Sequence, residues 1–364
     1  MAAMSASAFA QSSVTMYGVI DLATVYRTHV DASGNHAFSL GDTAGSLGDG
    51  GEGAFSGSRL GFKGTEDLGG GLKALFQLEA GLTANNGQSD QQGQLFGRQS
   101  YVGLSDKDLG TLTAGRQYGV ATQFTFDFDP LGLGNFVGNE WEAFLSGIRF
   151  DNSLEYSNSV GPVGVVLQYS VGGQAGSIRE GSTLGVNLKY VDGPIAVGGM
   201  YQQSYDVNLN TLKSTALGGT YDLGVGKVFA NYYYVQRDAG FHKASALSGG
   251  PLANTSSIAG NATTTRKDNV LVLGANYKLT SSDLATVGGM YDDITNATDL
   301  GNGKLGTVYA TVEHSLSKRT EVYAYVDYQR ASGQAIGNGG NSLNGIGSGY
   351  NSAYGLAVGV KHAF

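Results

Sequence analysis

The feature that most constrains this chain is a repeated alternation of apolar and polar side chains in segments of roughly ten residues, separated by turn residues. The segment 351–364 is the clearest example. There Leu356, Val358 and Val360 share one face, and small or polar residues between them share the other. Because successive side chains of a strand point to opposite faces, these segments predict β-strands with one apolar and one polar face.

The connections between the predicted strands alternate between short turns and long polar loops, which places all short turns at one end of a cylinder and all long loops at the other. Bacterial barrels of a single chain have an even number of strands, and those of about sixteen strands enclose an aqueous lumen. The sequence predicts sixteen strands: 13–27, 55–66, 70–83, 96–105, 110–118, 148–157, 163–171, 182–191, 194–204, 214–222, 226–237, 267–279, 284–293, 305–316, 320–331 and 351–364.

Composition favours the same fold and excludes several classes of protein. The chain has 59 Gly, 21 Tyr and no Cys, and only 14% of its residues are charged, about half the usual share. No apolar run is long enough for a transmembrane helix, but a closed barrel also satisfies its backbone in lipid. The net charge of −8 disfavours a nucleic-acid partner, and the absence of Cys excludes disulfides and thiolate metal sites. We therefore expect an all-β membrane barrel without a metal or a cofactor.

The first ten residues, MAAMSASAFA, are small and apolar, and they end in an A-x-A-like pattern, Ala8-Phe9-Ala10. We interpret residues 1–10 as the remainder of a signal peptide and residues 11–364 as one outer-membrane β-barrel domain. A disordered N-terminus is the alternative interpretation.

The segment 119–147 is far longer than a hairpin turn and lies between two predicted strands. Long loops are usually functional or disordered, and disordered ones are poor in aromatic residues. This segment contains five Phe and the only Trp of the chain, Trp141. We therefore expect it to pack inside the barrel as a constriction loop that narrows the opening.

Several blocks of the sequence resemble those of Gram-negative general porins, the trimeric outer-membrane porin family, in its β-proteobacterial branch. The blocks are QSSVTMYGVID at 11–21, SRLGFKGTEDLGGGLKALFQLE at 58–79, FGRQSYVGL at 96–104, GTLTAGRQ at 110–117 and RFDNSLEY at 149–156, followed by the terminal Phe364. The resemblance implies a sixteen-stranded, homotrimeric channel in the outer membrane, in contact with its lipid and lipopolysaccharide, whose third long loop folds into each pore.

Strand parity indicates which charged side chains face the lumen. Leu60 and Phe62 mark the outer face of their strand, so Arg59 and Lys63 are predicted to point inward. The same reasoning predicts that Arg98 points inward.

In the strand 148–157, Phe150 is predicted to face outward and Arg149 inward. Arg116 shares a face with Leu112 and Ala114 and is therefore predicted to lie on the outer side.

The resemblance also implies a cluster of arginines on the barrel wall opposite acids on the inserted loop. By motif position the cluster maps onto Arg59, Arg98 and Arg149, with Lys63 as a further basic candidate. The acidic candidates of the loop are Asp127, Asp129, Glu140 and Glu142. Opposed charges across a narrow pore would create a strong transverse field. The alternatives are solvated surface charges for the basic residues and bonds to backbone N–H groups for some of the acids.

An enzyme is disfavoured, because five His residues are scattered over loops and strand ends without a Ser and an acidic partner at fixed spacing. The sequence predicts a passive general-diffusion channel for ions and small hydrophilic solutes. A substrate-specific porin of the same fold, and a barrel acting mainly as a surface adhesin or receptor, are the alternatives. Ion preference stays open, because the wall arginines favour anions whereas the loop acids and the net charge favour cations.

Overall fold

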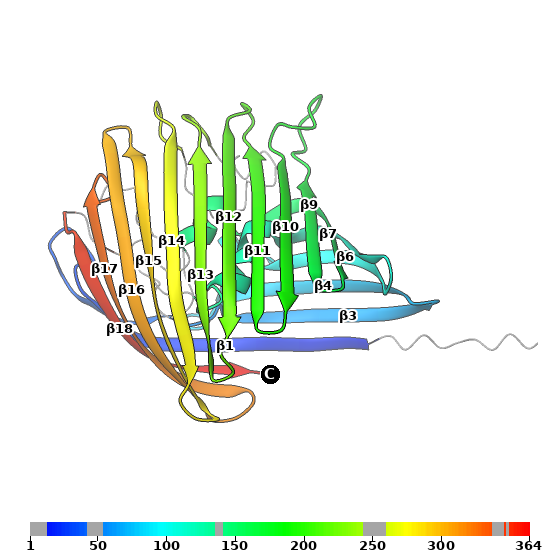
Figure 1. The fold of residues 1–364 in the computed structure, drawn as a ribbon, viewed down its shortest axis with the longest axis horizontal. Coiled ribbons are helices and arrows are strands. Elements are labelled where there is room, and N and C mark those ends of the chain that lie inside the picture. Colours follow the sequence, from blue (N-terminus) through cyan, green and yellow to red (C-terminus); the bar gives the residue numbers. More distant parts are fainter. Residues whose placement is uncertain (1–12, 42–53, 135–140, 243–259, 337–345, 347–348) are drawn as a thin grey trace, which may run out of the picture.

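The computed structural model describes residues 13–41, 54–134, 141–242, 260–336, 346 and 349–364. Within these residues, sixteen antiparallel strands form the wall of a closed barrel (Figure 1). They are β1 Ser13–Arg27, β3 Arg59–Gly69, β4 Leu72–Thr83, β6 Gln99–Asp106, β7 Gly110–Tyr118, β8 Arg149–Val160, β9 Val163–Ser170, β10 Thr183–Asp192, β11 Ile195–Tyr205, β12 Thr211–Asp222, β13 Gly226–Arg237, β14 Arg266–Lys278, β15 Asp283–Thr298, β16 Gly301–Ser315, β17 Thr320–Gly333 and β18 Ser352–Ala363. The predicted fold class and strand number are confirmed. The expected signal-peptide remnant, residues 1–10, lies outside the described residues.

The first and last strands pair with each other and close the barrel. Their register runs from Val19 opposite Ala363 to Arg27 opposite Gly355. The backbone groups of Gly18 and Phe364 exchange two hydrogen bonds of 3.1 Å, so the pairing continues to the final residue. Closure leaves no exposed strand edge in the wall, and an exposed edge is a site of aggregation.

The predicted two-sidedness is visible in the burial of successive residues. Along β16, Val308 is 58% exposed whereas its neighbours Thr307 and Tyr309 are 2% and 6% exposed. Exposed leucines and valines on the other strands form the same apolar outer surface, as a strand facing lipid requires. Among the described residues, no helix is long and apolar enough to cross a bilayer.

Three short elements in the long loops were not predicted. Strand β2 (Ala37–Gly41) pairs with the end of β1, and β5 (Gln88–Ser89) pairs with the end of β4. A single 3₁₀ turn, η1 (Gln91–Gly93), follows β5, and its first N–H is capped by the side chain of Asp90. These elements extend the wall beyond the barrel on the side of the long loops.

The constriction loop contains two helices, α1 (Val120–Phe128) and α2 (Trp141–Ser146), and lies inside the barrel. Helix α1 packs on a groove of inward-facing glycines on neighbouring strands. A β-carbon added at Gly218 would lie 2.8 Å from Cζ of Phe124, and one added at Gly198 would lie 2.7 Å from Cε2 of Phe128. Such distances are shorter than van der Waals contact, so the rings occupy the space that side chains would otherwise fill. Gly185 and Gly274 extend this glycine groove under Val120 and Pro130.

Helix α2 is anchored to the wall by polar contacts. The guanidinium of Arg237 donates from Nη2 to the carbonyl oxygen of Leu145 at 2.8 Å. The hydroxyl of Ser146 lies 2.6 Å from Ser214 Oγ and 2.7 Å from the hydroxyl of Tyr233. Apolar packing of α1 and hydrogen bonding of α2 therefore fix the loop to the inner side of β10–β14.

We expect the glycine groove to be necessary for docking of α1. The substitution Gly218→Val should destabilise the folded protein by about 1–3 kcal/mol, because the added methyl groups would overlap Phe124 and Phe128. The free energy of unfolding can be measured by urea titration, followed by the fluorescence of Trp141, the only tryptophan of the chain.

The matched control is Gly219→Val. A β-carbon at Gly219 would have its nearest neighbours at 3.5 Å, an ordinary contact, so this variant should retain wild-type stability. Equal stability of the two variants would show that the glycine groove does not hold the helix.

Candidate functional site

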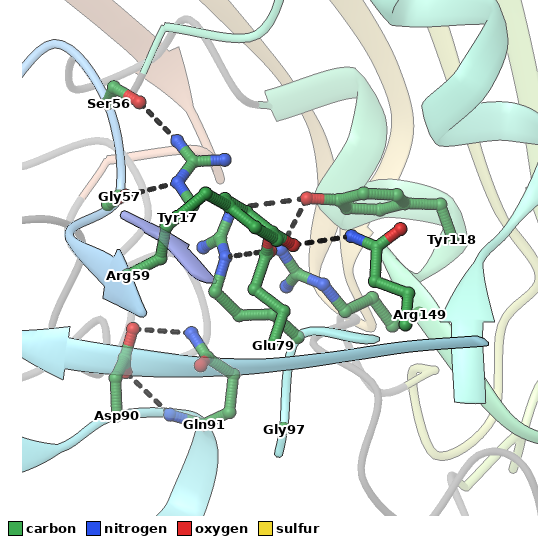
Figure 2. A network of polar contacts seen from close by, with 12 residues as sticks. Tyr17, Ser56, Gly57, Arg59, Glu79, Asp90, Gln91, Gly97, Tyr118 and Arg149 are labelled. Atoms are coloured by element: carbon green, nitrogen blue, oxygen red, sulfur yellow. Dashed lines mark hydrogen bonds and ion pairs between the residues drawn. The ribbon is translucent and has the colours of Figure 1, made fainter. Parts of the chain in front are cut away.

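The structure brings Arg59, Arg98 and Arg149 together on the inner side of the barrel, where Tyr118 packs against Phe126 of the inserted loop. Figure 2 shows Arg59 and Arg149 with Tyr118 and Glu79 between them. Arg59 begins β3, Arg98 immediately precedes β6 and Arg149 begins β8, so the three lie at the long-loop ends of neighbouring strands. We call these three residues the arginine cluster. Their positions follow from the barrel, because residues far apart in the sequence become neighbours when the strands pair in register.

The hydroxyl of Tyr118, the last residue of β7, connects two members of the arginine cluster. It accepts hydrogen bonds from Nη2 of Arg98 at 3.1 Å and from Nη2 of Arg149 at 2.9 Å. The guanidinium of Arg149 also lies over the Tyr118 ring, 4.5 Å from its centroid, which is a cation–π contact. Tyr118 thereby holds two like charges close together.

Glu79 of β4 is the carboxylate of the cluster. Its Oε1 lies 2.7 Å from Nε of Arg98, and its Oε2 accepts a hydrogen bond of 2.7 Å from the hydroxyl of Tyr17. The sequence interpretation missed both Glu79 and Tyr118. A signal for Glu79 existed, since Gln77 and Glu79 alternate with the apolar Leu78 and Ala80.

Arg59 is held by the segment that precedes its own strand. Its Nε donates to the carbonyl oxygen of Gly57 at 2.8 Å, and its Nη2 donates to the hydroxyl of Ser56. The backbone N–H of Ser56 in turn donates to Asp21 Oδ2 at 2.7 Å, and the other oxygen of Asp21 accepts from the hydroxyl of Tyr323. Strands β1 and β17 therefore position Arg59.

Members of the cluster differ in exposure. Arg98 is 7% exposed and Arg149 is 8% exposed, whereas Arg59 is half-buried. The first two can act on a solute mainly through their electric field, which the low-dielectric wall weakens little. Arg59 is the member that also offers contact surface.

Lys63 does not join the arginine cluster. It lies four residues farther along β3, a distance of roughly 13 Å in a strand. Its ammonium lies 5.2 Å from the centroid of the Tyr17 ring. Lys63 therefore adds positive charge on the same inner face but nearer the short-turn end.

The loop acids that the structure describes have partners other than the cluster. Asp127 Oδ1 lies 2.7 Å from Nζ of Lys189 on β10, and both side chains line a polar cavity of about 500 Å³. Asp129 is 3% exposed, and its Oδ2 accepts hydrogen bonds from the backbone N–H groups of Leu131 and Leu133. Asp129 thus anchors the loop, as the alternative interpretation of these acids anticipated. Glu140 and the side chain of Glu142 lie outside the described residues.

The predicted outward orientation is wrong for Phe150. Arg116 is 7% exposed and its Nη1 lies 2.7 Å from Oδ1 of Asp151, whereas Phe150 is fully buried in contact with the loop. The cause is a β-bulge between β7 and β8, where the register shifts and Asn152 has a φ of 54°. A bulge adds one residue to one strand and interrupts the regular alternation of its side chains.

Comparison with protein families and relatives gives a consistent result. The sequence profile of the Gram-negative porin family matches residues 1–334. An outer membrane porin protein of Bordetella pertussis is 30% identical over 360 residues, which cover 91% of this chain and 92% of the relative. Outer membrane porin protein 32 of Delftia acidovorans is 34% identical over 243 residues, which cover 62% of this chain and 65% of that protein.

Solved structures of similar fold include an anion-selective porin from Comamonas acidovorans, with a TM-score of 0.75, 25% identity, and coverage of 97% of this chain and 100% of that chain. The trimer form of OmpT from Vibrio cholerae has a TM-score of 0.67 and 14% identity, and covers 97% of this chain and 99% of that chain. The second likeness shows the fold alone.

We expect Glu79→Gln to destabilise the fold by about 3–5 kcal/mol, because it leaves the buried guanidinium of Arg98 without its carboxylate. The control Tyr17→Phe removes one hydrogen bond to the same carboxylate and should cost about 1.5–3 kcal/mol. The double variant Glu79→Gln/Arg98→Gln should recover part of the loss. Urea unfolding measures these three variants and the single variant Arg98→Gln. A double variant whose loss equals the sum of the losses of Glu79→Gln and Arg98→Gln would contradict the pairing.

Proposed function

Because this chain belongs to the Gram-negative porin family, we propose that it forms a passive, water-filled pore for ions and small hydrophilic solutes. The barrel is an outer-membrane protein, and its relatives are channels rather than enzymes. A pore of this kind needs no reaction chemistry or cofactor. It needs a narrow aqueous stretch where fixed charges select what passes.

The arginine cluster is the observation that carries this proposal. Three guanidinium groups gather beside the inserted loop, and Glu79 is the carboxylate that pairs with Arg98. Asp127 pairs with Lys189, and Asp129 accepts hydrogen bonds from loop backbone. Asp90 is a second carboxylate close enough to act on Arg98 and Arg149, so three guanidinium groups face two carboxylates. The local balance of charge is therefore positive although the net charge of the chain is −8.

From this balance we propose a preference for anions. Positive charges in a low-dielectric wall concentrate anions in the water beside them and repel cations. Arginine suits the role because its guanidinium stays charged at every physiological pH and presents a rigid fork to carboxylates and phosphates. The similarity to an anion-selective porin from Comamonas acidovorans supports the same preference.

The proposed assembly is a homotrimer embedded in outer-membrane lipid and lipopolysaccharide, as the family resemblance implies. A trimer form is known for OmpT from Vibrio cholerae, which shares the fold. Each protomer would contribute its own pore, since the closed wall and the inserted loop belong to one chain.

Replacement of the arginine cluster tests the ion preference. The triple variant Arg59→Gln/Arg98→Gln/Arg149→Gln should shift the reversal potential in a KCl gradient toward cation selectivity, because it removes three positive charges from the pore wall. The measurement uses reconstituted protein in planar bilayers.

A matched control removes the same number of positive charges from the outer surface and an exposed short turn. The variant Lys213→Gln/Lys318→Gln/Arg319→Gln changes net charge equally but leaves the lumen intact. If both triple variants shifted the reversal potential alike, the selectivity filter would lie elsewhere.

Single-channel recording tests general diffusion and assembly together. Conductance should rise in proportion to salt concentration, without saturation by a single solute. Each trimer inserted in the bilayer should close in three equal steps of conductance. Steep saturation by one solute would favour the substrate-specific alternative, and negligible conductance would favour an adhesin or a receptor.

A further inference from the structure

The polar cavity lined by Asp127 and Lys189 shares no residue with the arginine cluster. Its volume is about 500 Å³, within the usual range of about 300–1,000 Å³ for small-molecule sites. One side of the cavity is the inner face of β7–β10, and the other side is helix α1. Residues at the short turn between β6 and β7 also line it, so it lies at the short-turn mouth of the pore. We call this cavity the mouth pocket.

Helix α1 presents different side chains to its two sides. The phenylalanines of α1 pack on the glycine groove, whereas Gln123 and Asp127, one turn apart, face the mouth pocket. The ion pair of 2.7 Å between Asp127 and Lys189 joins side chains that are 31% and 38% exposed. An ion pair with this much exposure contributes little to stability, so a solute can separate its members at low cost. The pair therefore offers a solute one negative and one positive group.

Asn187 supplies the observation that points to a ligand. It lies two residues before Lys189 on the inner face of β10, lines the mouth pocket and is 5% exposed. Within the part of the chain that the structure describes, its buried Oδ1 accepts no hydrogen bond. An acceptor buried in this way costs free energy until a donor reaches it. The mouth pocket therefore favours a solute that brings an N–H or O–H group to Asn187.

Small side chains leave the rest of the mouth pocket open, namely those of Ser157, Ser159 and Gly164. A β-carbon at Gly164 would lie 3.5 Å from Ser159 Oγ and 3.9 Å from the carbonyl oxygen of Lys189, which are ordinary contacts. The fold therefore does not require glycine there, and glycine within a strand often marks a place where a ligand approaches. Among the described residues that line the pocket none is aromatic, so it provides no ring surface on which a sugar could stack.

The charged groups of the mouth pocket balance each other. Two acids and two cations line it, namely Asp106, Asp127, Lys107 and Lys189. Glu155 is not among the lining residues, and its Oε2 accepts hydrogen bonds of 2.8 Å from two glutamine amides. Binding sites are complementary in charge to what they hold. A pocket with balanced charges, unlike the arginine cluster, fits a solute that carries one charge of each sign.

We propose that the mouth pocket binds a zwitterionic solute, a free α-amino acid with a small polar side chain, on its way through the pore. The carboxylate of the solute accepts a hydrogen bond from the ammonium of Lys189, and its own ammonium donates to Asp127 and to Oδ1 of Asn187. This inference rests on the proposed pore, because the solute reaches the pocket through the lumen. The affinity is weak, since a site in a channel has to release what it binds.

The test is ligand-observed NMR, in which saturation is transferred from the purified, folded barrel in detergent to L-serine. Wild type should bind L-serine with a dissociation constant of about 1–10 mM. Two analogues each keep one charge, because 3-hydroxypropionate lacks the ammonium and ethanolamine lacks the carboxylate. Each analogue should bind about tenfold more weakly than L-serine, since it loses a charge-assisted contact.

Three variants test whether the binding occurs in the mouth pocket. Lys189→Gln and Asn187→Leu should each weaken L-serine binding about tenfold. Gly164→Val places a side chain in the pocket and should weaken binding about tenfold or more. Asn187→Leu should also retain wild-type stability in urea unfolding, because Oδ1 of Asn187 has no hydrogen bond to lose.

Matched controls come from other strands. Lys227 shares the inner face of β13 with the buried Asn231, near the short-turn end, and is not a lining residue of the mouth pocket. Lys227→Gln therefore controls for the loss of one cation in the lumen. Gly219→Val, on the outer face of β12, controls for the added side chain. Both controls should bind L-serine within about twofold of wild type.

Equal affinities of the pocket variants and their controls would overturn the proposal, as would the absence of L-serine binding to wild type. Binding of 3-hydroxypropionate as tight as that of L-serine would also overturn it, since the arginine cluster would then account for the capture of a carboxylate. The measurement involves no ion flow. A negative result here therefore leaves the reversal-potential test of the pore unaffected.

Discussion

The structure depends on one constraint: inside a bilayer every backbone N–H and C=O must find a partner within the protein. Sixteen strands satisfy this constraint because each pairs with its neighbours in the barrel, and the hydrogen bonds between Gly18 and Phe364 close the barrel. Closure also separates two environments, since alternate side chains face lipid or water. The same strand β16 therefore presents the exposed Val308 outward and the buried Thr307 inward.

Once the wall is closed, its interior can hold charges that an ordinary protein core would exclude. Arg98 and Glu79 are almost fully buried, yet they pair with each other and with the hydroxyls of Tyr118 and Tyr17. Burial of charge is tolerable only when the charges are paired and hydrogen-bonded. This network keeps positive charge beside the loop, because each of its guanidinium groups has at least one hydrogen-bond partner.

Glycine serves two different purposes on the two sides of the wall. Inside, Gly198 and Gly218 let Phe124 and Phe128 approach the backbone, so that helix α1 lies flat against the strands. Outside, a β-carbon at Gly306 would have its nearest neighbours, Met290 O and Tyr291 Cδ2, at 3.8 Å, so this glycine lies on an open part of the surface. The abundance of glycine, which in the sequence indicates only a β-rich and low-charge chain, thus reflects close approach of the loop on one side and an open surface on the other.

The sequence by itself determined the barrel, the number and approximate limits of its strands, and the inward direction of Arg59. It could do so because the period of two is local and the requirement for closure is general. Only the tertiary structure decided the partners of the pore residues. The bulge at Asn152 placed Phe150 inward against its predicted parity. Likewise, Asp127 forms an ion pair with Lys189, and Asp129 accepts hydrogen bonds from the loop backbone. Neither partner could be predicted, because contacts across the lumen depend on register and loop conformation, which no local pattern encodes.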